Sequence, residues 1–130
     1  MPNIHDYPIH LGLGATAIVQ SKFTNAMDWY DAYIDRNGAD GAEGRLVTMY
    51  RFAENWPMWE MHPNGDEVVL CISGSMTMYQ EMADGSTATA VIGPGEYAIN
   101  PPGAWHTVDV DGEASALFIT AGLGTQHRAR

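Results

Sequence analysis

The sequence predicts an all-β protein, a barrel or sandwich of many short antiparallel strands, with one short helix near the N-terminus. From Gly44 onward, short apolar and β-branched stretches alternate with turns that contain Gly or Pro. A single helical pattern precedes them, over Asn25 to Arg36. The 130 residues, 45% of them hydrophobic, are enough for one domain with one core.

The N-terminal segment, Met1 to Gln20, is weakly patterned, and we expect an arm with one strand near 17–19. Residues Gln126 to Arg130 are polar and basic, which is typical of a frayed tail. The expected division is an arm and helix packed on the barrel over 1–44, a barrel over 45–121 and a tail over 122–130, all within a single domain.

The predicted helix has apolar and aromatic residues at helical spacing, with aspartates on its other faces. Thr24 or Asn25 could cap its N-terminus, and Asn37-Gly38 ends it. We expect its aromatic stripe to pack against the sheet rather than to bind a ligand.

The predicted strands follow from β-forming runs between turn signals. They cover 45–52, 58–62, 67–73, 76–81, 87–92, 97–99, 106–110 and 116–120. The turn Ala83-Asp84-Gly85-Ser86 predicts a hairpin between 76–81 and 87–92.

The stretch Trp59 to Glu67 contains the first cluster of chemically active side chains. Glu60 and His62 are two residues apart, so on a strand they share one face. The turn Pro63-Asn64-Gly65-Asp66 follows, and Glu67 opens the next apolar run. We expect a hairpin that brings one imidazole and two carboxylates together, and these are ligand types for a divalent metal.

A second stretch, Gly95 to His106, supplies another histidine after a proline-glycine turn. The two stretches together resemble the two sequence motifs of the cupin superfamily. His62, Glu67 and Gly74 match the first motif, and Gly95, Pro101, Gly103 and His106 match the second. The resemblance covers about Arg45 to Ala121 and implies a small single-domain cupin of the RmlC-like, conserved-barrel type, with a double-stranded β-helix (jelly-roll) barrel.

The sequence departs from these motifs at three positions. Glu60 stands where the first motif has its first histidine, Asn55 where it has its opening glycine, and Val110 where the second motif has an asparagine. Of the three differences, Glu60 matters most for the chemistry, because it replaces a histidine that binds metal in the family.

The resemblance implies a metal site formed by Glu60, His62, Glu67 and His106. In one arrangement all four bind a divalent ion (Fe, Mn, Zn or Ni). In a second, His62, Glu67 and His106 bind it and Glu60 is a catalytic general base. In a third, Glu60 weakens the site and no metal is held. The plain alternative is a surface hairpin with no site.

Several residues are expected to line the barrel, where they could contact a small, partly apolar organic substrate or simply fill the core. They are Met58, Val69, Cys71, Met78 and Val108, with some of Tyr50, Trp56, Tyr97, Trp105 and Phe118. We expect Arg51 at the rim, paired with a surface acid. His5, His10 and His127 lie in ends that we expect to be mobile, and they are treated as background.

The resemblance implies an enzyme acting on a small organic molecule, of the oxygenase or lyase/isomerase type. The alternatives are a non-catalytic small-ligand-binding protein, with weak or no metal because of Glu60, and a structural or storage role. Fold alone does not choose among them.

Composition bounds the partners. Six basic against sixteen acidic residues give a net charge of −10, which disfavours nucleic acid and acidic membrane surfaces. We see no membrane span or signal peptide, and Cys71 is alone, so we expect a cytoplasmic protein. The resemblance implies a homodimer through the outer sheet and the arm, with Trp59 and Met61 as candidate interface residues.

Overall fold

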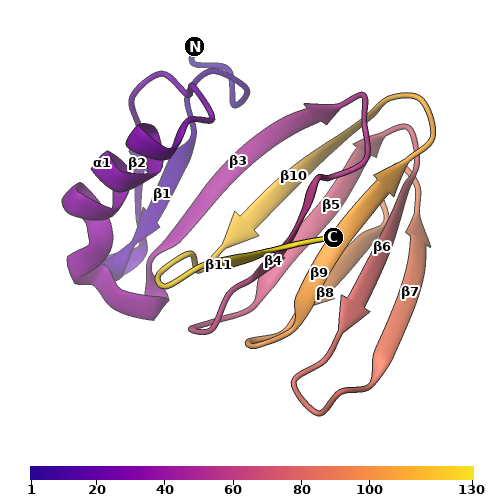
Figure 1. The fold of residues 1–130 in the computed structure, drawn as a ribbon. Helices are drawn as coiled ribbons and strands as arrows, with labels where there is room; N and C mark the ends of the chain where they lie inside the picture. Colours follow the sequence, from indigo (N-terminus) through magenta and orange to yellow (C-terminus); the bar gives the residue numbers. More distant parts are fainter.

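The computed structural model describes residues 1–130 and confirms the predicted all-β barrel of two antiparallel sheets with one short helix (Figure 1). The strands are β1 Ile9–Gly12, β2 Thr16–Val19, β3 Arg45–Phe52, β4 Met58–Met61, β5 Glu67–Ser73, β6 Met76–Glu81, β7 Thr87–Ile92, β8 Tyr97–Asn100, β9 Trp105–Val110, β10 Ala114–Thr120 and β11 Gln126–Ala129. The helix α1 spans Met27–Asn37, and short 3-10 turns span Leu13–Ala15 and Gly38–Glu43. No helix is long and apolar enough to cross a membrane.

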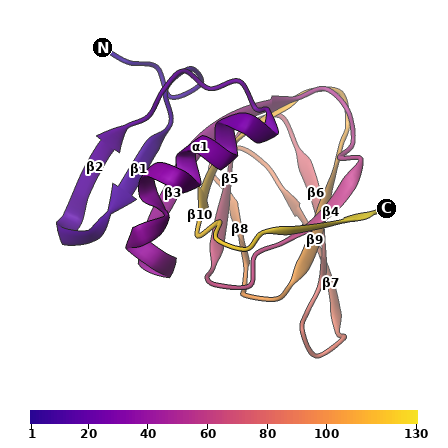
Figure 2. The same ribbon diagram turned by 60° about the vertical axis from the view of Figure 1, so that its left-hand side comes forward.

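The two sheets enclose a common interior, as the view in Figure 2 shows. One sheet has the order β2-β1-β3-β10-β5-β8, and the other has the order β11-β4-β9-β6-β7. Alternate residues of each strand point inward and close one part of the barrel with an apolar core. The core contains Val69, Cys71, Met76, Met78, Ile92, Val108, Ala114, Ala116 and Phe118.

The structure explains why the closing residue of the first motif, Gly74, is a glycine. It lies between β5 and β6 with φ +75°, and a Cβ there would meet the Glu113 carbonyl oxygen at 2.2 Å. Only glycine allows the chain to turn so close to the start of β10.

The predicted hairpin between β4 and β5 is wrong. β4 pairs with β9 and β11, whereas β5 pairs with β10 and β8 in the other sheet. The turn over 63–66 therefore carries the chain from one sheet to the other, because turn residues predict a reversal but not which strands pair. Consequently Glu60 and Glu67 face each other across the barrel.

The N-terminal arm forms two paired strands, whereas the sequence predicted only one strand there. The strand expected near 17–19 is β2, and it forms a hairpin with β1, which extends the sheet beside β3. Treating His10 as background in a mobile end is wrong, since it is 1% exposed. Its Nδ1 bonds the Tyr33 hydroxyl and its Nε2 bonds Asp40 Oδ2, both at 2.7 Å.

The helix forms where predicted, but its start and its faces differ from the expectation. Its N-cap is Ala26, with no capping side chain, so the prediction of Thr24 or Asn25 is wrong. Trp29 is buried, as expected for packing. Tyr30 and Tyr33, however, line a large cavity, and Glu60, His62 and Glu67 line the same cavity.

The predicted frayed tail is also wrong, because Gln126–Ala129 forms β11 and pairs with β4 along its length. The Arg128 guanidinium lies 5.1 Å from the ring of Trp59 and 4.6 Å from that of Trp105. Trp105 therefore packs under Arg128 and does not line the barrel. Tyr97 does not line it either, since it is 63% exposed.

Candidate metal centre

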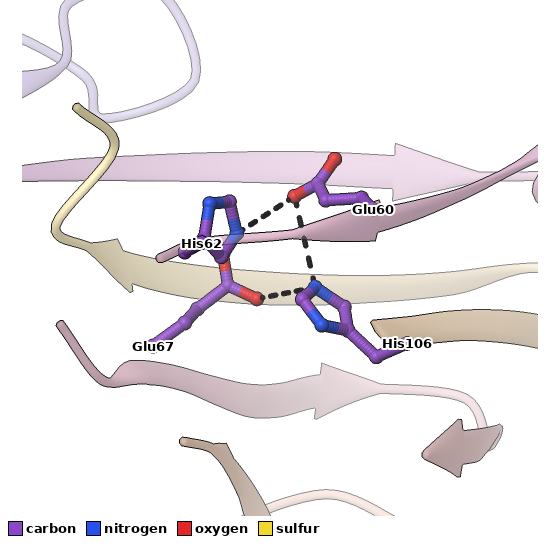
Figure 3. A group of neighbouring side chains, drawn as sticks. All are labelled: Glu60, His62, Glu67 and His106. Carbon is purple, nitrogen blue, oxygen red and sulfur yellow. Dashed lines mark ion pairs between the residues drawn. The ribbon is translucent and has the colours of Figure 1, made fainter. Parts of the chain in front are cut away.

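Four side chains converge where the two sheets face each other (Figure 3). Glu60 comes from β4, His62 follows that strand, Glu67 begins β5 and His106 lies in β9. One ligand atom from each lies within 4.8 Å of all the others. His62, Glu67 and His106 are buried at 3%, 1% and 0% exposure, whereas Glu60 is 25% exposed. The structure thus brings together the four residues that the sequence singled out.

Backbone pairing explains this convergence. Glu60 lies directly opposite His106 on β9 and opposite His127 on β11. The Gly103 amide donates to the His62 carbonyl at 3.1 Å, which ties the second-motif turn to the first. A Cβ at Gly65 would lie 2.6 Å from that of Ala121, so the turn before Glu67 packs closely on the end of β10.

The donor atoms have the spacing of ligands around one ion. His62 Nε2 lies 3.0 Å from Glu60 Oε1 and 3.0 Å from Glu67 Oε2. His106 Nε2 lies 3.2 Å from Glu67 Oε1 and 3.8 Å from Glu60 Oε1. Donors bound at about 2.1 Å to one ion are about 3.0 to 3.4 Å apart for octahedral or tetrahedral angles. Both Nε2 atoms are buried and neither is aligned for a hydrogen bond.

The outer hydrogen bonds of the histidines fix which nitrogen is free. His62 Nδ1 lies 2.7 Å from Thr125 Oγ1, whose hydroxyl donates to the Gly122 carbonyl, so Nδ1 must donate to Thr125. His106 Nδ1 lies 3.1 Å from the Ala104 carbonyl, which can only accept. In the neutral form each imidazole therefore carries its proton on Nδ1 and directs the Nε2 lone pair into the cluster, as metal-binding histidines do.

The two carboxylates are held differently. Glu67 Oε1 accepts from Asn100 Nδ2 at 3.1 Å, and its Oε2 accepts from the Thr120 hydroxyl at 2.7 Å. Glu60 has no such pair of donors; its Oε2 lies 3.5 Å from His127 Nε2. The prediction that His127 lies in a mobile end with no role at the site is therefore wrong. No local sequence signal marks it, because only the pairing of β11 with β4 places it beside Glu60.

The groups shift one another's protonation. Burial would lower the pKa of His62 and of His106, but the carboxylates of Glu60 and Glu67 outweigh it and raise these values to about 10 and about 9. Burial would raise the pKa of Glu67, yet the two histidines lower it to about 2. Burial also opposes ionisation of Glu60, whose pKa the surrounding histidines hold well below its ordinary value. Two imidazolium and two carboxylate groups balance in charge, so a divalent ion can replace two protons without changing the net charge.

A cavity of about 900 Å³ adjoins the cluster and is lined by Glu60, His62 and Glu67 on that side. Of the residues predicted to line the barrel, Met58, Tyr50, Trp56 and Phe118 line this cavity. Val69, Cys71, Met78 and Val108 are instead wholly buried in the core. Arg51 is 67% exposed and pairs with Glu113 at 3.1 Å, which confirms the predicted rim position.

No protein-family model matches the sequence, and the search of curated proteins found no match. Among solved structures, oxalate oxidase in complex with glycolate is similar in fold, with a TM-score of 0.55 and 18% identity over 63% of this chain and 45% of that one. Oxalate decarboxylase has a TM-score of 0.53 and 20% identity over 66% of this chain and 23% of that one. A cupin superfamily protein from Desulfitobacterium hafniense has a TM-score of 0.50 and 18% identity over 58% of this chain and 65% of that one.

At these identities the likeness is one of fold. It agrees with the two sheets, with the positions of both sequence motifs and with the convergence of Glu60, His62, Glu67 and His106 inside the barrel. The narrower RmlC-like placement stays a prediction. This chain has the cupin fold.

Proposed function

We propose that the chain is a metal-dependent enzyme that acts on a small organic molecule in the cavity beside Glu60. The observation that carries the proposal is the pair of histidines whose Nδ1 atoms are committed to outer partners, with both Nε2 atoms near two carboxylates. Such a set suits Fe, Mn, Zn or Ni. A divalent ion bound there would act as a Lewis acid toward a substrate oxygen.

We assign different roles to the four residues according to how exposed each side chain is. His62, Glu67 and His106 are buried and would hold the ion. Glu60 is the most exposed of the four, so it would either complete the ligand set or accept a proton from the substrate at Oε2. His127, 44% exposed and 3.5 Å from that oxygen, could pass the proton to solvent.

The reaction class follows from the metal. Iron would support an oxygenase reaction, and manganese, nickel or zinc a lyase or isomerase reaction. The fold neighbours include oxalate oxidase and oxalate decarboxylase, so both oxidative and non-oxidative chemistry occur on this fold. This supports a small-molecule substrate without choosing the reaction.

The decisive measurement is the metal content of untagged protein, beside a His62→Ala/His106→Ala double variant. We expect near-stoichiometric metal in the first and none in the second. The identity of the metal then selects the assay: oxygen uptake for iron, and lyase or isomerase screens for manganese, nickel or zinc. Absence of metal from both proteins, even after reconstitution with Fe(II), Mn(II), Ni(II) and Zn(II), would contradict the proposal.

The second candidate is a small-ligand-binding protein without catalysis. The balanced charges of two imidazolium and two carboxylate groups favour it, since the cluster would be neutral without an ion. Ligand binding unaffected by chelators would distinguish it from the enzyme.

We also propose a cytoplasmic homodimer that pairs through the outer face of the larger sheet. Ile72, Tyr97 and Ile99 are exposed on that face at 42%, 63% and 49%. Trp59 is a weaker interface candidate than the sequence indicated, because Arg128 covers it. Light scattering of the purified protein tests the dimer.

A further inference from the structure

A second polar group lies in the cavity beside the metal centre. It consists of the hydroxyls of Tyr30 on α1 and Tyr50 on β3, with the side chain of Asn25. The two hydroxyls hydrogen-bond each other, and Tyr50 donates to Asn25 Oδ1. All three residues line the same cavity as Glu60 and His62. This cluster has no role in holding the metal.

The direction of these hydrogen bonds leaves one oxygen available. A hydroxyl donates a single hydrogen bond. Both hydroxyls have Asn25 Oδ1 as an acceptor, and Tyr50 is the nearer donor. When Tyr50 donates to Asn25, Tyr30 donates to Tyr50, and the lone pairs of the Tyr30 oxygen can accept from a ligand hydroxyl. Burial raises the pKa of Tyr30 to about 12, so the group is a neutral hydroxyl at pH 7.

Aromatic rings connect this tyrosine pair to the metal centre. The ring of Tyr50 stacks on Phe52 at 5.5 Å, Phe52 lies 5.6 Å from Trp56, and Trp56 lies 6.3 Å from the ring of His106. Phe118 packs against both Tyr50 and Trp56, at 5.7 and 6.0 Å. These rings give a flat apolar ligand a continuous aromatic wall between the tyrosine pair and the candidate metal centre.

The charge of the cavity lining disfavours anions. Its carboxylates are Asp31, Glu54, Glu60 and Glu67. Its basic groups are Arg51, which already pairs with Glu113, and His62 and His127, which lie against Glu60. The two positive charges of a divalent ion would still leave the lining negative. A dicarboxylate would therefore be repelled, whereas an uncharged molecule would not.

We propose that the substrate is an uncharged aromatic molecule with hydroxyl groups, bound with its ring along Phe52 and Trp56, one hydroxyl on Tyr30 and a second oxygen toward Glu60 and His62. The placement of the ligand oxygen near Glu60 and His62 rests on the proposed metal function. The placement of the ligand hydroxyl on Tyr30 rests on the tyrosine pair alone.

The test is a ligand-observed NMR titration with 4-hydroxybenzyl alcohol as the probe, on protein with and without Mn(II). Tyr30→Phe should weaken its binding roughly 3- to 10-fold, the worth of one hydrogen bond. The same substitution should leave the binding of toluene, which has no hydroxyl, unchanged. Tyr33→Phe is the matched control: Tyr33 lies on the same helix and lines the same cavity, but its hydroxyl bonds His10. The anionic analogue 4-hydroxybenzoate should bind more weakly than the alcohol.

Three outcomes would overturn the inference: no binding of 4-hydroxybenzyl alcohol, an equal effect of Tyr30→Phe on toluene, or tighter binding of 4-hydroxybenzoate. Metal content measured on the same samples separates the two proposals. Bound metal with no dependence on Tyr30 rejects this inference and leaves the metal function. Binding that depends on Tyr30 in protein that takes up no metal supports the tyrosine site and rejects the metal function.

Discussion

The two sheets that form the candidate metal centre hold their carboxylates differently, and each sheet is one wall of the site. The wall from the larger sheet carries Glu67, 1% exposed, with both oxygens bonded to Asn100 and Thr120. The wall from the smaller sheet carries Glu60, 25% exposed, with His127 on the edge strand as its only outer partner. A carboxylate fixed at both oxygens cannot reorient, whereas one facing a cavity can.

This difference assigns separate tasks to residues of the same type. Under the proposed metal function Glu67 would be the permanent ligand, because its outer donors, Asn100 and Thr120, orient it before an ion binds. Glu60 can leave or rejoin a ligand set as substrate enters, and it can accept a proton. We call the Glu67 side of the site, on the larger sheet, the rigid wall, and the Glu60 side, on the smaller sheet, the flexible wall. The two roles expected for Glu60 from the sequence, ligand or base, are both compatible with this arrangement.

The largest expected effect is that of pH on metal affinity, to which both walls contribute. The carboxylates raise the pKa of His62 to about 10 and that of His106 to about 9, so at neutral pH an ion must displace two protons. Affinity should therefore rise about 100-fold per pH unit between pH 6 and 8. Calorimetry in buffers of different ionisation enthalpy should show about two protons released.

The same shifts affect the stability of protein without metal. A raised histidine pKa contributes stability that is complete below the unfolded value of about 6.5 and is lost as pH rises through about 9 to 10. The folding stability of chelator-treated protein should therefore decline as the pH rises from about 6.5 to about 10. Metal binding with no proton release would contradict both expectations.

The next effect separates the two carboxylates. Glu67→Gln should reduce metal affinity by more than about 100-fold, beyond the range for outer partners, because a rigid buried ligand is lost. Glu60→Gln should reduce it by about 10-fold, because the cavity side can admit water as a replacement ligand. Equilibrium metal competition measures both. Equal losses would show that the two walls do not differ.

Substitution of the outer partners should reduce metal affinity by less than Glu67→Gln does. Thr120→Val keeps the shape of the side chain but removes the donor to Glu67 Oε2, and should cost about 10-fold or more in metal affinity. His127→Gln should change affinity by less than about threefold, since it touches Glu60 at only 3.5 Å. Under the proposed proton path it should lower turnover instead. A larger loss of affinity from His127→Gln than from Thr120→Val would reverse the assignment of the rigid wall.

The four residues of the candidate site and most of the strands could be predicted from the sequence, because each follows from a regular spacing of residues. His62, Glu67 and His106 lie at motif positions that set strand and turn geometry, and Glu60 shares a face with His62, so the four could be named before their sheets were known. The strands followed from alternation and turn residues. Gly74 was recognised from its spacing, and the close approach to Glu113 explains it.

The residues that sequence reasoning missed depend on contacts distant in the chain. His127 meets Glu60 only because β11 pairs with β4, and Gln126–Ala129 has no apolar alternation to predict a strand. His10 is buried by partners 23 and 30 residues away. The stripe on α1 was visible, but periodicity does not tell whether Tyr30 meets a core or a cavity.

The smallest expected effect concerns Arg128, which holds β11 beside the strand that carries Glu60. Arg128 holds β11 by lying over Trp59 and Trp105 and by bonding Glu81, yet it is 38% exposed. Arg128→Gln should lower the free energy of unfolding by about 1 kcal/mol, since exposed cation–π and ion-pair contacts are weak. Because it loosens β11, it should also reduce metal affinity slightly, through Glu60. Arg51→Gln, at a more exposed ion pair away from β11, is the control and should leave metal affinity unchanged. Chemical denaturation and metal competition on both variants provide the measurements. An effect of Arg51→Gln as large as that of Arg128→Gln would mean that β11 does not support the Glu60 side of the site.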